Sequence, residues 1–540
     1  MIPRFAARLR KLRRAVSRTE WAVRLLGLPR STGTASEPGL ILIQIDGLGH
    51  DQFRRALRNG RLPFIARLLN REGYRPYSWY SGMPSTTPAV QGELFYGVKC
   101  AVPAFQFRDH ETGELNSMLD ADAASRVEER LSREGEPLLA DGSAYSDVYT
   151  GGSARPHFCS AAMGLGDILK HARPLTLLVV LLMNLTMVIR MAVLAVVELV
   201  LAVTDLFRGI IAREDLLKEL TFVPSRVGVC ILLRELVTMG VRTDAARGVP
   251  IIHCNLLGYD EQAHRRGPRS RFAQWTLKGI DRAIKNIWKT AQRSRCRTYD
   301  IWIYSDHGQE YSEDYPALTG RTIHRAVEAA FAKHGVTGRR AQPLSAQIQL
   351  RRFNWLGGRW AQRLFGRSHT APPPADVEVA AMGPVAHVYA PEPLSDAQKA
   401  AVAQDLAGEG QVPLVMTKDD AGEITAWTGR GAFPIPERMD EAVGAGHPFL
   451  EQLREDLPPV VRHPDAGVFV LFGWRPTGQP ATFAVENGAH GGPGVHETRG
   501  FAAVPGDIEF AGSREGNVIR PIELRHAALH LLGRKARDEE

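Results

Sequence analysis

Seven side chains in this chain have the types and settings that a phosphoryl-transfer site needs. Most lie at the end of an apolar run or beside glycine: Asp46, Thr86, Asp260, His264, Asp306, His307 and His490. Carboxylate oxygens and imidazole nitrogens are the ligands that hard or borderline divalent cations prefer. Two cations a few ångströms apart can stabilise both the attacking and the leaving oxygen of a phosphoryl group. The set therefore predicts a site for two divalent cations and one nucleophile.

Two of the segments pair their candidate ligands. Asp260 and His264 are four residues apart, so a helix would place both on one face. Asp306 and His307 are adjacent at the end of an apolar run, and Gly308 permits a turn that brings both toward one opening. Either pair alone is a common surface pattern. The joint occurrence of all the segments favours metal ligation.

His490 is the candidate ligand in the last segment. It lies between Gly-Ala and Gly-Gly, where the small side chains let the backbone approach a phosphate closely. His496, six residues later, is a competing ligand for the same cation. The surrounding glycines favour His490.

Thr86 is the candidate nucleophile, and it is also predicted to contact a cation. An alcohol has a pKa far above neutral, and coordination to a divalent cation activates it. Residues 89–94 could begin a helix whose N–H groups face the phosphoryl oxygens. Ser85 and Thr87 are rivals that spacing alone does not separate from Thr86. A helix-capping threonine without chemistry is the other interpretation.

Strands that alternate with helices must position these side chains. The nearly continuous apolar run at 40–45 suits a strand buried on both faces of a parallel sheet. Similar runs occupy 249–254, 300–305 and 467–472, and helical spacing occurs at 62–69 and 272–291. The alternation predicts an α/β fold with a mostly parallel central sheet flanked by helices. In such sheets ligands bind beyond the carboxyl ends of the strands, which is where Asp46 and Asp306 fall.

Composition bounds the class of protein. The chain has 540 residues, of which 44% are apolar and 23% charged, as in a globular protein. The five cysteines are scattered without a CxxC pair. A zinc knuckle or a disulfide framework is therefore not expected, and the cysteines fit a reducing compartment. We also find no dinucleotide or P-loop motif and no nucleic-acid-binding module in the sequence.

The first part of the chain is strongly basic. The formal net charge is +8, and residues 1–30 hold nine Arg or Lys but one acid, interleaved with apolar residues. This pattern is typical of an amphipathic helix on an anionic membrane surface, with a solvated arm as the alternative. An apolar h-region and a cleavage site do not follow the basic start, so no cleavable signal peptide is expected.

Residues 175–203 form a long apolar segment that Asn184, Arg190 and Glu198 interrupt. Candidate ligands lie on both sides of it, so both flanks must be on the same side of any membrane. A single crossing is thereby excluded. A hairpin around Arg190 has arms of about fifteen residues, short of the roughly twenty that a span needs. We therefore predict a shallow membrane association, with a soluble helix pair as the alternative.

Taken in order, the segments resemble the alkaline phosphatase superfamily, specifically its type I phosphodiesterase/nucleotide pyrophosphatase branch. The shared pattern is an early Asp after a strand, a Thr two residues before a Pro, Asp-x-x-x-His, Asp-His-Gly and a late Gly-x-His-Gly. The resemblance covers roughly 38–110, 248–312 and 465–505. It implies an alkaline-phosphatase-like fold and two divalent ions, with Zn favoured over Mn or Mg. One ion would be surrounded by Asp46, Thr86, Asp306 and His307, and the other held by Asp260, His264 and His490.

The chain also departs from the family pattern after the proline that follows Thr86 and Thr87. Nucleotide pyrophosphatases usually carry an Asn directly after the Pro, where it helps to hold the phosphoryl oxygens, and this chain has Ala89. That contact is missing here or is supplied elsewhere. The sulfatase signature Cys/Ser-x-Pro-x-Arg is absent around Thr86, which argues against sulfate esters.

These features predict a division of the chain into six parts. They are a basic arm and linker (1–37), a hydrophobic helical insertion (161–247), a small α+β subdomain (377–430) and three parts of one catalytic domain (38–160, 248–365 and 431–540).

The function predicted is a metal-dependent phosphoric ester hydrolase, a phosphodiesterase that acts near a membrane. Thr86 would attack as a metal-bound nucleophile and form a covalent phospho-enzyme intermediate. The alternatives on the same site are a phosphomonoesterase, a phosphonate hydrolase and a phosphoethanolamine-type transferase. A membrane-associated scaffold with a structural metal site is the non-enzyme alternative. The expected partners are a phosphate-ester substrate and a bacterial-type cell membrane, which 175–203 and the basic arm would contact.

Overall fold

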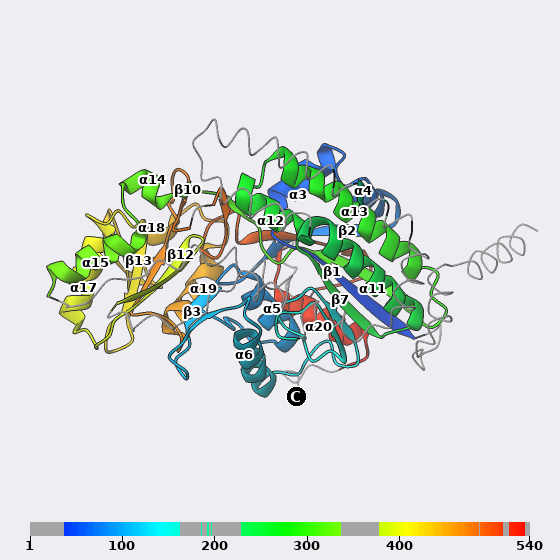
Figure 1. Cartoon of the computed structure of the whole chain (residues 1–540), viewed down its shortest axis with the longest axis horizontal. Coiled ribbons are helices and arrows are strands. Elements are labelled where there is room, and N and C mark those ends of the chain that lie inside the picture. Colours follow the sequence, from blue (N-terminus) through cyan, green and yellow to red (C-terminus); the bar gives the residue numbers. More distant parts are fainter. Residues whose placement is uncertain are drawn as a thin grey trace, which may run out of the picture.

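The computed structural model has two large sheets, each covered by helices on both faces (Figure 1). The structure describes residues 37–162, 228–335, 377–484, 486–510 and 518–534, together with Leu185, Ile189, Ala192, Val193 and Val196. The basic arm, and the apolar segment 175–203 apart from those five residues, therefore lie outside the described residues.

The larger sheet has eight strands in the order β20-β2-β19-β8-β1-β7-β5-β6. Their bounds in that order are Val518–Ile519, Tyr74–Tyr80, Arg499–Pro505, Thr298–Tyr304, Pro38–Ile45, Ile251–Leu256, Ser143–Tyr145 and Arg155–His157. Every pairing is parallel except the two that β19 makes. The predicted α/β class with a mostly parallel central sheet is confirmed.

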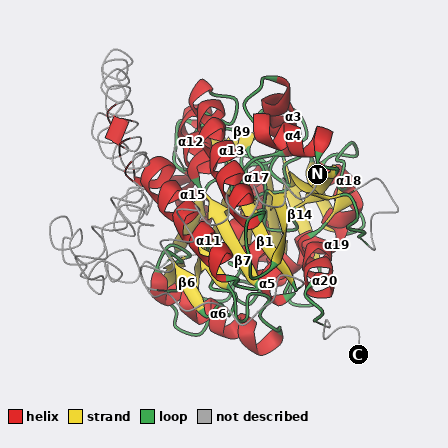
Figure 2. Cartoon of the chain, turned by 90° about the vertical axis from the view of Figure 1, so that its right-hand side faces the viewer, coloured by secondary structure: helices red, strands yellow, loops and turns green. Residues whose placement is uncertain are grey.

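Helices cover both faces of this sheet, as Figure 2 shows. One face packs against α3 (His50–Arg58), α4 (Pro63–Arg71), α11 (Arg234–Arg247), α12 (Gly258–Arg266) and α13 (Arg271–Ala291), with the π-helical turn Gly228–Leu233 before α11. The other packs against α5 (Thr87–Tyr96), α6 (Ala121–Glu134) and α20 (Pro521–Leu531). Strand β1 serves both cores, because Leu40 and Leu42 face one and Ile41 and Ile43 the other.

The second sheet has six antiparallel strands in the order β11-β12-β16-β13-β14-β15. Their bounds in that order are Glu378–Met382, Val385–Tyr389, Phe469–Phe472, Leu414–Lys418, Ile424–Thr428 and Gly431–Ile435. One face carries α15 (Ile323–Lys333) and α17 (Asp396–Ala407), and the other carries α18 (Met439–Val443) and α19 (Leu450–Arg462). Short elements complete the fold: β3 (Gln106–Arg108), β4 (Leu115–Ser117), β9 (Glu310–Tyr311), β10 (Glu313–Asp314), α14 (Tyr315–Thr319), β17 (Ala481–Thr482) and β18 (Gly488–Ala489).

The apolar run at 467–472 is predicted as a strand of the parallel sheet, and this prediction is wrong. It forms β16, in the middle of the antiparallel sheet, with β12 on one side and β13 on the other. A central strand is buried on both faces in either kind of sheet, so its apolar pattern does not reveal the direction of its neighbours.

No helix in the described ranges is long and apolar enough to cross a bilayer. The membrane prediction for 175–203 concerns a segment that lies almost wholly outside those ranges.

Candidate active site

The carboxyl ends of β1 and β8 bring three predicted ligands together. Asp46 follows β1, and Asp306 and His307 follow β8, its parallel neighbour. One ligand atom from each of the three lies within 4.8 Å of the others. The Nε2 atom of His307 lies 3.7 Å from Asp46 Oδ1 and 3.3 Å from Asp306 Oδ2. We call these three residues the strand-end cluster.

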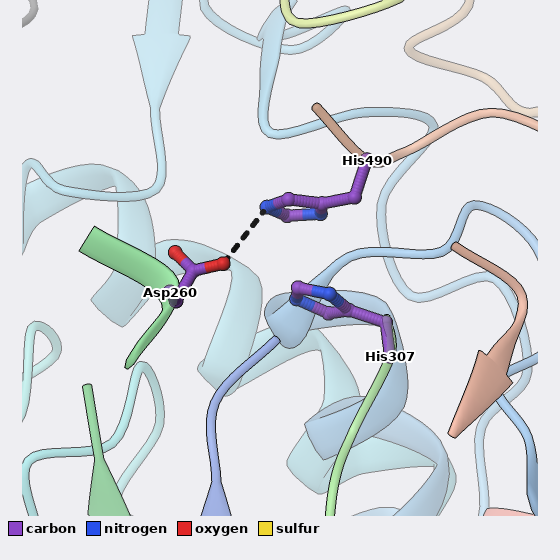
Figure 3. Close-up of side chains that lie close together, drawn as sticks. All are labelled: Asp260, His307 and His490. Atoms are coloured by element: carbon purple, nitrogen blue, oxygen red, sulfur yellow. Dashed lines mark ion pairs between the residues drawn. The ribbon is translucent and has the colours of Figure 1, made fainter. Parts of the chain in front are cut away.

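A second group comes from a helix and a loop. Asp260 and His264 lie on α12, one turn apart, and His490 follows the short strand β18. His264 Nε2 lies 3.1 Å from Asp260 Oδ2 and also 3.1 Å from His490 Nε2. Figure 3 shows Asp260 facing His490, with the rings of His307 and His490 stacked beside it. We call Asp260, His264 and His490 the helix-loop cluster.

All three imidazoles turn the same nitrogen toward the centre of the site. The Nδ1 atom of His307 is 2.9 Å from the carbonyl of Gly308, and that of His490 is 2.9 Å from the carbonyl of Ser85. His264 Nδ1 is 3.0 Å from Glu486 Oε2. When such a ring is neutral, a proton on Nδ1 leaves a lone pair on Nε2, as in metal-ligating histidines whose other nitrogen is anchored.

This arrangement fits divalent cations. Two unprotonated Nε2 atoms 3.1 Å apart repel unless a proton or a cation lies between them. Two ligands of one cation, with bonds of about 2.0–2.1 Å, can take that separation. The Asp260, His307 and His490 ligand atoms also lie within 4.8 Å of one another, so His307 faces both clusters. The resemblance had assigned His307 to one ion only.

Burial and crowding perturb the ionisation of these groups. Burial, with Asp306 and Asp260 nearby, raises the pKa of Asp46 well above its usual range, and burial raises the pKa of Asp306 to about 6. Burial lowers the pKa of His307 to about 4, and burial with His307 nearby lowers that of His490 to about 3. Such opposed shifts in one cavity are typical of functional sites.

The helix-loop cluster also holds a strongly coupled pair. Burial alone would raise the pKa of Asp260, but His264 and His490 hold it far below its usual range. Burial alone would lower the pKa of His264, but Asp260 and Glu486 raise it well above its usual value. Each residue thus favours the charged form of the other.

The three hydroxyl candidates occupy different settings. Ser85 Oγ donates to the carbonyl of Gly492 at 2.8 Å, which makes it a structural group. Thr87 Oγ1 donates to Asp306 Oδ2 at 2.7 Å. Thr86 is the N-cap residue of α5 and is 2% exposed, and its Oγ1 has no hydrogen-bond partner within the described part of the chain. Thr86 therefore has the buried hydroxyl that remains available.

The structure also separates the two competing histidines. His496 Nδ1 pairs with Asp51 at 3.4 Å, and its side chain is 42% exposed. His490 lines the cavity with Asp46, Thr86, Asp260 and His264. All seven predicted residues are thus brought together, and His496 lies outside their group.

Sequence reasoning missed the polar residues behind these ligands. Glu486 and Asn255 contact predicted ligands directly: Asn255 Nδ2 donates to Asp46 Oδ2 at 2.6 Å. Gln309 Nε2 donates to Asp260 Oδ1. A usable signal was present for Asn255, because it and His253 are the two polar residues in the otherwise apolar strand β7.

A family model described as type I phosphodiesterase / nucleotide pyrophosphatase matches residues 230–495. The predicted family is confirmed. Within the type I phosphodiesterase match lie Asp260, His264, Asp306, His307 and His490, whereas Asp46 and Thr86 precede it. The match supports a phosphoryl-ester hydrolase of a metal-dependent family, and the Asp/His clusters are able to bind ions.

Solved structures of two proteins resemble the chain along its length. Phosphonoacetate hydrolase from Sinorhizobium meliloti 1021 is 13% identical, with a TM-score of 0.43. Murine ectonucleotide pyrophosphatase / phosphodiesterase 5 is 12% identical, with a TM-score of 0.47. In each case 93% of this chain and 96% of the other are covered. None of the curated proteins matches the sequence.

Proposed function

We propose that the chain is a two-metal phosphodiesterase that uses Thr86 as its nucleophile. The observation that carries the proposal is the position of Thr86: its buried, unpartnered hydroxyl lines the same cavity as Asp46, Asp260, His264 and His490. A buried hydroxyl without a partner is costly, and a functional site is the usual reason for one.

Residues of both clusters would hold the cations. Asp46, Asp306, His307 and Thr86 are proposed to surround one ion, and Asp260, His264 and His490 the other, with Zn favoured over Mn or Mg. Bound cations would supply Lewis-acid stabilisation of phosphoryl oxygens and lower the pKa of an alcohol or water. Their number and identity are part of the proposal.

The chain's own groups then define two displacement steps. In the first, Thr86 Oγ1 forms a bond to phosphorus while the bond to the leaving alcohol oxygen breaks, and that oxygen takes up a proton. In the second, water attacks the phospho-threonine, releases the phosphomonoester and restores the hydroxyl. Thr86 lies at the N-terminus of α5, whose N–H dipoles favour negative charge on the phosphoryl oxygens.

The proposal includes a membrane surface as the working environment. It is supported by the composition of 175–203 and of the basic arm. Leu185, Ile189, Val193 and Val196 are helical residues 47%, 54%, 56% and 61% exposed, at spacings that share one helix face. Flotation of the full chain with anionic vesicles should be lost when Ile189 and Val193 are both changed to Asp. Flotation unaffected by that change, or absent in the wild type, would refute this part.

The decisive experiment compares bis-p-nitrophenyl phosphate with p-nitrophenyl phosphate, with added Zn²⁺ or Mn²⁺. Wild type should cleave the diester faster, and Thr86→Val should reduce kcat by about 10³-fold or more, as removal of a nucleophile does elsewhere. Thr87→Val is the comparison variant. A smaller loss is expected because it removes the Thr87 contacts to Asp306 Oδ2 and His307 Nε2 but leaves the Thr86 hydroxyl in place. Faster monoester cleavage would instead indicate a phosphatase.

The remaining alternatives give different results in the same assay. If Thr87→Val abolishes turnover while Thr86→Val does not, Thr87 is the nucleophile. Bound metal without Thr86-dependent turnover of either ester would favour a transferase with a demanding acceptor or a structural metal site. A phosphonate hydrolase would cleave a phosphonate in preference to both esters.

A further inference from the structure

The active-site cavity is lined by polar residues besides the predicted ligands and nucleophile. The cavity has a volume of about 120 Å³. Phe105, Leu119, Met382 and Val385 form an apolar part of its lining, and Ser146, Asp147 and Asn255 lie beside the ligands. We propose that these three form a subsite, here called the acceptor subsite, for a primary ammonium group on the substrate. The inference rests on the proposed phosphoric ester hydrolase.

Each residue of the acceptor subsite has a buried oxygen with no partner. Ser146, Asp147 and Asn255 are 3%, 2% and 2% exposed. Among the described residues, no hydrogen-bond partner lies near Ser146 Oγ, Asp147 Oδ2 or Asn255 Oδ1. Buried polar atoms are nearly always paired, so three orphaned oxygens lining one cavity indicate that a ligand pairs with them.

The other atoms of these side chains fix which oxygen is left over. Asn255 Nδ2 donates to Asp46 Oδ2 at 2.6 Å, so its Oδ1 remains as an acceptor. Asp147 Oδ1 lies 2.9 Å from His253 Nδ1 and accepts from Gln91 Nε2 at 3.2 Å, so Oδ2 remains. The Asn255 contact also ties the subsite to Asp46 of the strand-end cluster.

A buried network holds Asp147 in this orientation. Tyr304 OH lies 2.7 Å from His253 Nε2 and donates to Gln44 Oε1 at 3.2 Å. Gln91 Nε2 donates to the same Gln44 oxygen at 3.2 Å. The side-chain oxygen of Gln91, Oε1, accepts from the Val148 N–H. The network links β1, β7, β8 and α5 through side chains that solvent does not reach. A polar network of this kind rigidifies the groups at its end.

Ser146 occupies its place at a conformational cost. Its φ is +63°, in the left-handed region of backbone conformation that residues other than Gly and Asn rarely adopt. Strained residues of this kind cluster at ligand-binding positions. The backbone here delivers the hydroxyl to the cavity although glycine would suit the turn better.

The chemistry of the subsite selects its ligand. Two of the three orphaned atoms are acceptors only, and the serine hydroxyl can also accept. No Lys or Arg is among the described residues that line the cavity, whereas Asp147 and Glu261, two carboxylates outside the proposed metal ligands, are. A primary ammonium group has three donors and a positive charge, which matches three acceptors in an acidic cavity. The proposed substrates are phosphoric esters with a primary amine a short chain from the phosphorus.

The test varies one group of a chromogenic diester. Ethyl, 2-aminoethyl and 2-(trimethylammonio)ethyl p-nitrophenyl phosphates share a leaving group and differ in the retained group. We expect kcat/KM for the aminoethyl ester to exceed that of the ethyl ester by about tenfold or more. Equal values for the two would overturn the inference. A trimethylammonio ester as good as the aminoethyl ester would also overturn it, because that group has charge but no donor.

Variants then locate the preference. The ratio of aminoethyl to ethyl turnover should fall toward one in Asp147→Asn and in Ser146→Gly, which suits the positive φ. Ser153→Ala, a serine of the same region that does not line the cavity, should retain the ratio. A ratio unchanged in both subsite variants would overturn the assignment of these residues.

A binding measurement separates this inference from the proposed function. Calorimetry with ethylphosphonate, 2-hydroxyethylphosphonate and 2-aminoethylphosphonate, in the presence of Zn²⁺, needs no turnover. Tightest binding of the aminoethyl compound supports the subsite even if no ester is cleaved, in which case the hydrolase proposal alone fails. Equal binding of the hydroxyethyl and aminoethyl compounds would overturn ammonium selection in favour of any donor.

Discussion

The strand-end cluster and the helix-loop cluster are built from similar side chains but held in different ways. The side chains of His307 and Asp46 are 0% and 5% exposed, against 11% and 15% for those of His490 and Asp260. The strand-end cluster is positioned by the register of parallel strands, in which Gln44 of β1 is paired with Tyr304 of β8. The helix-loop cluster instead depends on side-chain contacts between α12 and a glycine-rich loop.

This difference assigns different tasks to the surrounding residues. Asp306 of the strand-end cluster is locked by the Gly47 N–H at 3.2 Å and by the Thr87 hydroxyl, both close in the fold. In the helix-loop cluster, His264 is anchored by Glu486 and His490 by the carbonyl of Ser85, and no pairing between neighbouring strands fixes these two side chains. Because the register of β1 and β8 also holds the strand-end cluster, we expect that cluster to tolerate loss of its side-chain supports better than the helix-loop cluster does, and loss of its ligands worse.

The largest effect is expected from Asp306→Asn. Asp306 contacts His307, Thr87 and the Gly47 N–H, so no other carboxylate can replace it. Diester turnover should fall by about 10³-fold or more, with loss of one bound ion from metal analysis. Asp300→Asn, near the opposite end of the same strand, is the matched control. It should keep both the diester turnover and the number of bound ions of wild type. Two retained ions with near-normal turnover would show that the strand-end cluster is not a metal site.

A smaller effect is expected from Glu486→Gln, which changes a support and no ligand. The carboxylate of Glu486 lies 3.0 Å from His264 Nδ1 and orients the ring. Loss of such an anchor should weaken binding of one ion about 10- to 100-fold while the other stays bound. Titration of the apo-protein with Zn²⁺ measures the affinities of both ions. Excess Zn²⁺ should restore turnover. The exposed Glu313→Gln is the control, and two equally weakened ions would contradict the difference between the clusters.

The predictability of the site follows the same division. Asp46, Asp306 and His307 could be predicted because each ends an apolar strand, and Asp260 and His264 because of their helical spacing. His490 needed the resemblance as well as its glycines. Within 377–430, where a small α+β subdomain is predicted, the structure has strands at 378–382 and 385–389 and a helix at 396–407. Local patterns are sufficient where one element supplies both the side chain and its direction.

The remaining features depend on pairings that no local pattern encodes. Asp147 and His253 are 106 residues apart and meet only because β5 and β7 are adjacent in the sheet. The run at 467–472 joins the antiparallel sheet because of where its partners lie, and its own residues do not specify that. Glu486 and Glu497 resemble any surface acid in the sequence, although Glu497 is fully buried. Long-range contacts of this kind require the three-dimensional fold.

The smallest expected effect concerns Glu497, which lies beneath the loop of His490. Its carboxyl group accepts from the N–H groups of Gly492 and Gly494, both at 2.8 Å, and from Ser85 Oγ. Burial, with Glu310 nearby, nevertheless raises the pKa of Glu497 to about 8. The folded protein therefore keeps a proton that the unfolded chain releases near pH 4.5. The stabilisation that comes from the raised pKa of Glu497 is fully present below pH 4.5 and is lost as the pH rises toward 8.

Glu497→Gln keeps the shape of the protonated acid and removes its titration. The unfolding free energy of the variant should thus fall less than that of wild type between about pH 5 and pH 8. For a chain of 540 residues each kcal/mol corresponds to about one degree in Tm, so replicate thermal melts across this pH range are compared. Glu313→Gln should parallel wild type. Parallel curves for Glu497→Gln and wild type would mean that the three hydrogen bonds keep Glu497 ionised, and that the loop of the helix-loop cluster rests on a charged group and not on a neutral one.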